Sequence, residues 1–199
     1  MEPLASQLRA RLQERPGRPV NLPGMVLREA AVLVPLLSRG GVPHVLFTVR
    51  PGHLRQHAGQ ISFPGGSREQ GDPTPLHTAL RETDEELGIP PGSVEVLGRL
   101  DETPTNTDFR VVPYVGLLPE GQALRPNADE VAELLEVPLP HLLRPEIARV
   151  ERWWVKGGEH DVHFFDYGAH VIWGATGRIV RNLLDVAADL PAWKAWMRP

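Results

Sequence analysis

The feature that most constrains this chain is the segment ALRETDEELG (79–88), in which acidic residues recur at helical spacing. At about 100° per residue, Glu82, Glu85 and Glu86 fall on one face of a helix. The residues expected to pack on a sheet fall on a second face: Leu76, Leu80, Thr83 and Leu87. Like charges at this spacing destabilise an isolated helix by roughly 0.2–0.5 kcal/mol per pair. The pattern therefore predicts a cation that offsets this repulsion.

Signals at both ends delimit the acidic helix. Thr74 is a suitable N-cap, Pro75 stands at the first helical position, and Gly88 follows the last turn. Before the helix, the run Phe63–Gly66 ends a short strand and leads into a polar loop. Its glycines let the backbone approach a ligand closely and leave a carbonyl for a metal shell.

Carboxylates without histidine or cysteine in the set favour a hard cation, and Mg²⁺ or Mn²⁺ is the expected choice. A strand, a glycine turn, a loop and an acidic helix together suit a metal-bound diphosphate. The alternative is a solvated acidic face with Arg81 as its neighbour, and the glycines alone are consistent with a plain tight turn. The residues by themselves leave both interpretations open.

Composition limits the classes of protein that remain. The chain has 199 residues, no cysteine, and 21 basic against 25 acidic residues. This excludes a disulfide framework and a cysteine zinc site, and argues against a general nucleic-acid binder. No apolar run approaches the roughly 20 residues of a membrane helix, and the first residues lack the apolar stretch of a signal peptide. We therefore expect a cytoplasmic globular protein without nucleic-acid or membrane partners.

Strand-like segments alternate with helical ones along the chain. Strands are expected at 30–37, 44–50, 60–63, 94–101, 110–118, 136–139, 152–155, 162–167 and 170–173. Further helices are expected at 1–15, around Asp129–Leu135 and at about Thr176–Leu190. This mixture predicts an α/β or α+β sandwich. Three tryptophans lie in or beside the later strand segments: Trp153, Trp154 and Trp173. They could stack an adenine, but aromatic residues in strand segments more often belong to a core.

We expect an N-terminal helical arm and linker at 1–29, a compact domain at 30–190 and a tail at 191–199. Leucines four residues apart mark the apolar stripe of the arm: Leu4, Leu8 and Leu12. The stripe is expected to dock the arm rather than to bind a membrane.

The segment GGSREQGDPTPLHTALRETDEELGI (65–89) resembles a Nudix box. Its matching positions are Gly66, Arg81, Glu82, Glu85, Glu86, Gly88 and Ile89. Asp72 replaces the usual intermediate glutamate and lies one residue further from Arg81, while Thr83 fills an apolar position. The resemblance implies an α/β/α sandwich with a mixed central sheet.

The preceding segment, LFTVRPGHLRQHAGQISFPGG (46–66), resembles the signature of the coenzyme A pyrophosphatase branch of that family. The matching positions are Thr48, Arg50, Arg55, Gly59 and Phe63 to Gly66. Phe47 and Pro51 depart from the signature. With later segments at 130–143 and 171–184, the resemblance covers about Ala30 to Leu190.

The resemblance implies divalent-metal-dependent hydrolysis of the diphosphate bond of coenzyme A or its derivatives. Glu82, Glu85, Glu86 and the Gly66 carbonyl would hold the metal, and Arg81 would orient the carboxylates. Glu130 is a candidate general base, although it is equally consistent with an ordinary first-turn acid.

On the substrate side, the resemblance implies that Arg50, Arg55, His57 and Gly65 contact the ligand. The alternatives are solvated edge charges for the arginines and a loop cap for the histidine. Two other functions stay open: hydrolysis of another nucleoside diphosphate derivative, and nucleotide sensing without catalysis. The partner would be a small-molecule substrate, and the protein a monomer or homodimer.

Overall fold

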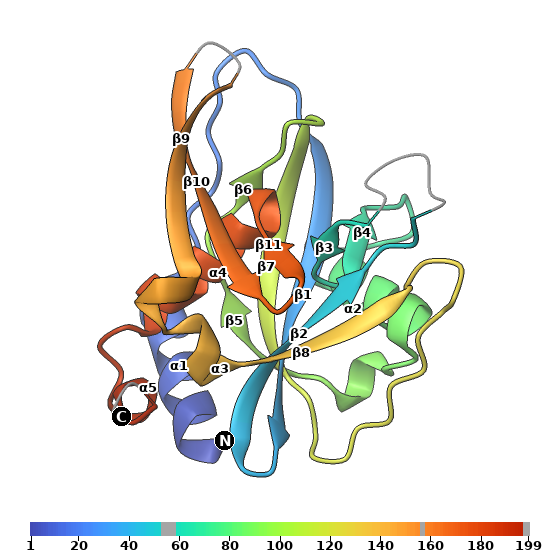
Figure 1. Ribbon diagram of the computed structural model, residues 1–199. Coiled ribbons are helices and arrows are strands. Elements are labelled where there is room, and N and C mark those ends of the chain that lie inside the picture. The colour runs from blue at the N-terminus through green and yellow to red at the C-terminus, as the bar shows by residue number, and fades with distance from the viewer. Residues whose placement is uncertain (53–58, 156–157, 197–199) are drawn as a thin grey trace.

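The computed structural model describes residues 1–52, 59–155 and 158–196 (Figure 1). The helices are α1 (Glu2–Glu14), α2 (Pro75–Leu87), α3 (Leu139–Leu142), α4 (Gly174–Ala187) and α5 (Pro191–Lys194), with 3-10 turns η1 (Pro91–Ser93) and η2 (Pro145–Ile147). The strands of the larger sheet are β1 (Arg28–Arg39), β2 (Val42–Val49), β3 (Ile61–Ser62), β4 (Gly65–Ser67), β5 (Glu95–Arg99), β6 (Thr103–Pro104), β7 (Phe109–Leu117) and β8 (Glu133–Pro138). The strands of the smaller sheet are β9 (Ala148–Val155), β10 (Gly158–Tyr167) and β11 (His170–Ile172).

The larger sheet is mixed. Its main path runs β3-β2-β1-β7-β5. Outside this path, β4 pairs with β1, β6 pairs with β7, and β8 pairs with β2. Strands β1 and β7 are parallel, and β2 and β4 lie antiparallel to β1 on different stretches of it. The mixed central sheet predicted from the resemblance is confirmed.

Helices lie on both sides of this sheet (Figure 1). Helix α2 packs against β1, β4 and β7, and on the other side α4 contacts β6 and β10 while α1 packs against β5, α4 and α5. Because successive strand residues point to opposite faces, Ala31 of β1 packs with Ala79 of α2, whereas its neighbour Ala30 joins the larger core on the α4 side. The α2 side therefore has a thin, small-residue interface, which brings that helix close to the sheet.

The ends of α2 match the sequence prediction. The Thr74 side chain accepts a hydrogen bond from the His77 backbone N–H, and Gly88 takes a left-handed conformation after the last turn. The buried face of α2 is rotated toward the glutamates relative to the predicted packing face. It includes Ala79, Thr83, Glu86 and Leu87. The expected packing face was therefore wrong in part: it left one of the three glutamates out of the protein interior.

The helix expected around Asp129–Leu135 is wrong. Its second half belongs to strand β8, which pairs with β2 and buries Leu135 and Val137 in alternation. Strand β4, which consists of Gly65, Gly66 and Ser67, was not expected as a strand, because glycine has a low strand propensity. Its pairing with β1 fixes the glycine turn against the central sheet.

The smaller sheet projects from the sandwich as a long hairpin (Figure 1). Trp154 is 73% exposed, and Trp153 and Trp173 are 37% and 39% exposed. The expectation that these tryptophans belong to the core is wrong, because each is more than a third exposed. Instead, Trp153 and Trp173 pack with the buried ring of Phe164, with ring centres 5.8 to 6.0 Å apart.

The apolar stripe of α1 is buried. Leu4, Leu8 and Leu12 are each at most 3% exposed and belong to the same core cluster as residues of α4 and the central sheet. Within the described residues, no helix combines the length and the apolar character needed to cross a membrane.

Candidate active site

Glu86 is the most unusual acidic residue of the α2 face. It is 5% exposed, and its Oε2 atom is buried without a hydrogen-bond partner in the described part of the chain. Burial, followed by the nearby charges of Glu82 and Glu130, raises the pKa of the Glu86 carboxyl to about 8, while a hydrogen bond from the Gly65 backbone acts in the other direction. A carboxylate held in this way is poised to gain from a cation.

Glu82 lies against the glycine turn. A Cβ atom at Gly66 would fall 2.5 Å from the Glu82 carboxyl carbon, so the missing side chain leaves the space that the carboxylate occupies. Burial raises the pKa of Glu82, although the neighbouring Arg81 guanidinium opposes this shift. The Gly66 backbone and the Glu82 carboxylate are thus brought together by the folding of β4 under α2.

Glu85 lies apart from the other two glutamates. Its side chain is 54% exposed, and Oε2 accepts a hydrogen bond from Nη1 of Arg81 at 2.8 Å. The three glutamates therefore share a helix, but only Glu82 and Glu86 point toward the turn between β3 and β4. Recruitment of Glu85 to a cation requires it to leave Arg81.

Arg81 is anchored by Asp72, whose role the sequence left undetermined. Nε and Nη2 of Arg81 donate to the two Asp72 carboxylate oxygens at 3.1 and 3.0 Å. The carboxylate is buried and also accepts hydrogen bonds from Thr78 Oγ1 and the Glu69 backbone N–H. These bonds, the one from Arg81 foremost, hold the pKa of Asp72 well below its usual range. Asp72 thus acts by fixing Arg81, not by facing the glycine turn.

Arg81 distributes its remaining donors over the acidic face. Nη2 also donates to Glu82 Oε1 at 2.9 Å, and Nη1 holds Glu85. Its pKa is raised above the usual arginine range, mainly by the bonds to Asp72. Arg81 therefore contacts Glu82 and Glu85, and its role in orienting them stays a prediction. Asp72, which also accepts from Thr78, is a support of Arg81 that the helix pattern alone did not identify.

Two residues from other parts of the chain come near Glu86. Glu130 lies in the loop before β8 and is exposed, and its charge contributes to the raised pKa values of both Glu82 and Glu86. Arg50 follows β2 and favours the charged form of Glu86, and its Nε atom is buried without a hydrogen-bond partner among the described residues. Arg55 and His57, the other expected substrate contacts, lie outside the described residues.

The residues of the glycine turn fit a hard divalent cation. Glu82 and Glu86 offer carboxylate oxygens, one of them buried without a partner, and the absent side chain at Gly66 opens access to its backbone. Across residues 1–52, 59–155 and 158–196, however, no three acidic or histidine side chains are gathered as a preformed cage. The exposed position of Glu85, held by Arg81, explains why the third carboxylate does not join the other two.

Comparison with protein families places a NUDIX domain at residues 27–156. The uncharacterized Nudix hydrolase NudL of Yersinia enterocolitica is 42% identical over 158 residues, which cover 77% of this chain and 78% of that protein. The protein of the same name from Escherichia coli K12 is 40% identical over 159 residues, covering 78% and 81% of the two chains.

Among solved structures, a MutT/nudix family protein from Enterococcus faecalis superposes with a TM-score of 0.53 at 18% sequence identity. The superposition covers 85% of this chain and 66% of that one. At this level of identity the likeness concerns the fold alone, and it agrees with the mixed sheet and flanking helices.

Proposed function

Because the chain belongs to the Nudix hydrolase family, we propose that it hydrolyses the diphosphate bond of coenzyme A or its thioesters. Water adds across the P–O–P bridge, giving 3′-phosphoadenosine 5′-phosphate and 4′-phosphopantetheine or its acylated form. The observation that carries the proposal is the buried, unpartnered Glu86 oxygen beside Glu82 and the glycine turn. The coenzyme A branch motif at 46–66 supports the choice of substrate.

A divalent cation, Mg²⁺ or Mn²⁺, would neutralise phosphate oxygens and lower the pKa of a water nucleophile when bound. Glu82, Glu86 and the Gly66 carbonyl would hold it, and Glu85 would join them on release from Arg81. Arg81 keeps Glu82 oriented through the hydrogen bond at 2.9 Å, and Asp72 keeps Arg81 in place.

Glu130 is the residue that we assign as general base. It is exposed, it does not belong to the helix that holds the cation, and its charge is felt by both Glu82 and Glu86. Its carboxylate can therefore accept the proton of the attacking water without leaving the cation unliganded.

Arg50 is the residue that we propose binds a phosphate of the substrate. Its guanidinium is close enough to Glu86 to stabilise the charged carboxylate. Its buried Nε–H group has no hydrogen-bond acceptor among the described residues. A phosphate oxygen would satisfy this donor with a charge-assisted hydrogen bond. Arg55, His57 and the Gly65 backbone complete the proposed substrate contacts.

The test is a comparison of substrates with Mg²⁺ and Mn²⁺ in separate reactions, with products identified by mass spectrometry. The panel contains coenzyme A, acetyl-coenzyme A, ADP-ribose, a dinucleoside polyphosphate and a nucleoside triphosphate. We expect coenzyme A or its thioester to have the highest kcat/KM and to release the two predicted products. In water enriched in oxygen-18, the phosphorus that is attacked will carry the label.

A much higher kcat/KM with ADP-ribose or a nucleoside triphosphate would overturn the coenzyme A assignment and leave a Nudix hydrolase of other specificity. Nucleotide binding without turnover of any compound would point instead to a sensor. The Arg55→Ala variant adds a finer comparison, because it should weaken coenzyme A more than 3′-dephospho-coenzyme A. Equal losses for the two would contradict a 3′-phosphate contact at Arg55.

A further inference from the structure

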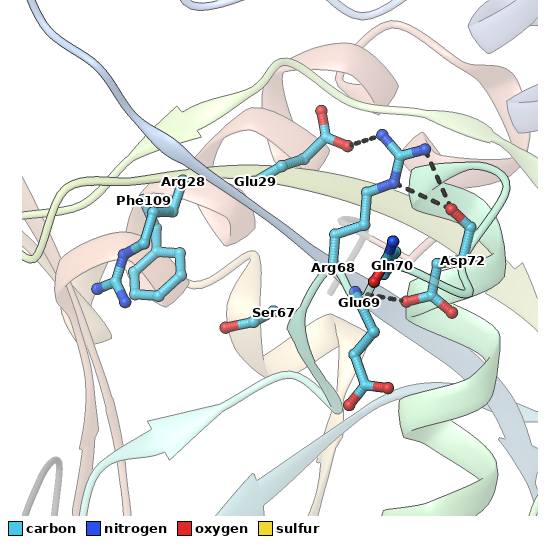
Figure 2. A pocket seen from close by; sticks show the side chains of 8 residues that line it. All are labelled: Arg28, Glu29, Ser67, Arg68, Glu69, Gln70, Asp72 and Phe109. Carbon is cyan, nitrogen blue, oxygen red and sulfur yellow. Dashed lines mark hydrogen bonds and ion pairs between the residues drawn. The ribbon is translucent and has the colours of Figure 1, made fainter.

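A hollow of about 570 Å³ lies beside the glycine turn (Figure 2). One wall consists of Arg28 and Phe109, and the opposite wall is the loop from Arg68 to Asp72. Ser67 lies between the two walls. Arg28 and Phe109 are far apart in the sequence, and the parallel register of β1 and β7 places them opposite one another.

The hollow and the carboxylate site are joined by strand β4. Ser67 lines the hollow and directly follows Gly66, whose backbone faces the Glu82 carboxylate. Gly66 pairs with Ala31 of β1, and Arg28 lies three residues earlier on the same strand. At about 3.3 Å per residue, this places Arg28 roughly 10 Å along the sheet from the proposed cation site. Its side chain points to the face opposite α2, because residues 28 and 31 of one strand lie on opposite faces. A nucleotide whose diphosphate is bound at Gly66 would cross the backbone of the short strand β4 to bring its ribose and base to the hollow that Ser67 lines.

The wall formed by Arg28 and Phe109 is a flat stacking surface. The Arg28 guanidinium carbon lies 4.0 Å from the centre of the Phe109 ring, and Nη2 donates to the Thr107 carbonyl. Phe109 is partly buried and packs against the main core. The guanidinium is thus held by the ring and by the Thr107 carbonyl, and planar cations of this kind can stack on nucleobases.

Most charges around the hollow are already balanced. Glu29 is paired with Arg68 at 2.7 Å and with Arg110, and Asp72 is paired with Arg81. In the described ranges no ion pair engages Arg28 or Glu69, the other two charged residues of the lining. The opposite charges of Arg28 and Glu69 make the hollow better suited to bind a neutral ring with polar edges than a second phosphate group.

The geometry points to this hollow as the subsite for the purine base of the substrate, stacked on the Arg28 guanidinium, with Ser67, Glu69 and Gln70 available to its polar edge. This inference rests on the proposed function, because it assumes that the diphosphate lies at Gly66. It identifies the end of the substrate that Arg28 and Phe109 recognise as the nucleotide, not the pantetheine.

The test compares adenosine 5′-monophosphate with ribose 5-phosphate, which lacks the base, by calorimetric titration of the full chain in the presence of Mg²⁺. We expect the nucleotide to bind at least about tenfold more tightly, which lies within the range of base-stacking contributions. Arg28→Met should remove about tenfold from the affinity for the nucleotide and leave that for ribose 5-phosphate unchanged. Phe109→Tyr should keep the wild-type difference, because the ring remains.

Arg149→Met is the matched control. Arg149 also covers a phenylalanine ring, with its guanidinium carbon 4.4 Å from the centre of Phe164, but it belongs to the projecting hairpin. This variant loses the same kind of stacked cation and should bind both ligands as the wild type does. Thermal unfolding midpoints of the variants show that each is folded at the titration temperature.

Equal affinities for the two ligands in the wild type, or equal behaviour of Arg28→Met and Arg149→Met, would overturn the base subsite. A parallel loss of ribose 5-phosphate binding in Arg28→Met would assign Arg28 to a phosphate and overturn it as well. These titrations do not require turnover. A protein that shows the expected binding difference but hydrolyses none of the substrates would therefore retain the subsite and lose the proposed function.

Discussion

Arg81 and Asp72 form a two-point ion pair, Nε to Oδ1 at 3.1 Å and Nη2 to Oδ2 at 3.0 Å, on a carboxylate that is almost fully buried. The same guanidinium holds Glu82 and Glu85. The acidic face of α2 is therefore ordered by a residue of the preceding loop, and the loop is ordered by the helix in return.

Replacement of Asp72 by Asn should destabilise the protein by about 3 kcal/mol, because it leaves a largely buried arginine without its main partner. The measurement is urea unfolding at neutral pH. The pKa of Asp72 is lowered in the folded state, so its contribution is present above the unfolded value of about 4 and is lost as the pH falls below it. The difference between wild type and variant should therefore shrink in acid.

Asp84→Asn is the control for this variant, since Asp84 is an exposed acid of the same helix. It should change the free energy of unfolding by no more than about 0.5 kcal/mol. Equal stabilities for the two variants would contradict the anchoring role of Asp72.

Replacement of Glu86 by Gln should lower kcat by orders of magnitude while the fold is kept, because the amide keeps the shape and loses the charge that a cation needs. The measurement is turnover of the best substrate at saturating Mg²⁺, with circular dichroism as the check on folding. Asp84→Asn again serves as the control and should retain wild-type turnover. A Glu86→Gln variant with unchanged kcat would show that Glu86 is not a cation ligand.

The same variant should be more stable than the wild type at alkaline pH when metal is removed with EDTA. The pKa of Glu86 is raised to about 8 in the folded state, so the charged form is disfavoured by folding. The penalty is absent below the unfolded value of about 4.5, grows as the pH rises to about 8, and is constant above that. At about 1.36 kcal/mol per pKa unit, it reaches the order of a few kcal/mol.

Thermal unfolding of both proteins between pH 4 and pH 9 measures this difference. A gap that does not change with pH would mean that Glu86 is not buried as a carboxyl in the metal-free protein. Addition of Mg²⁺ at pH 8 should raise the midpoint of the wild type more than that of Glu86→Gln.

Local signals in the sequence were sufficient for α2, because caps act within one turn and Thr74 and Gly88 lie at its ends. They were misleading at β8. Val131, Leu134 and Leu135 have helical spacing, yet the backbone of this segment pairs with β2, a partner that the local pattern does not reveal. The burial of the tryptophans was mispredicted for the same reason, because their exposure depends on which distant segments cover them.

The candidate site shows the same division. The helical wheel brought the glutamates to one side of α2, but it could not show that Arg81 draws Glu85 away or that Asp72 directs Arg81. Arg28 and Phe109 carry no local motif, and only the register of β1 and β7 joins them. The sequence therefore predicts which residue types form this site better than it predicts which of these residues contact one another.

Gly66→Ala should reduce turnover with little loss of stability. The added Cβ would fall 2.5 Å from the Glu82 carboxyl carbon, and a flexible carboxylate can move away from it, at the expense of the cation site. Gly65→Ala is the contrasting variant. Gly65 has φ of 150°, and its Cβ would meet the Ala31 backbone oxygen at 2.3 Å, which cannot move without disturbing β1.

We therefore expect Gly65→Ala to lose about 3 kcal/mol of stability from backbone strain and crowding. Turnover and urea unfolding of the two variants separate these effects. Equal destabilisation of both would show that Glu82 cannot yield and that the turn tolerates no side chain at either position.

The last prediction concerns α1, which precedes the family match at 27–156. Leu8 is fully buried among residues of the main core, so Leu8→Ala should cost about 3 kcal/mol through lost burial and the cavity that remains. Leu22→Ala is the control, since Leu22 is 39% exposed in the segment between α1 and β1 and should have little effect. Because α1 packs mainly on β5, α4 and α5, Leu8→Ala should keep the wild-type KM below its unfolding temperature. A stability equal to that of Leu22→Ala would show that α1 adds nothing to the folded domain.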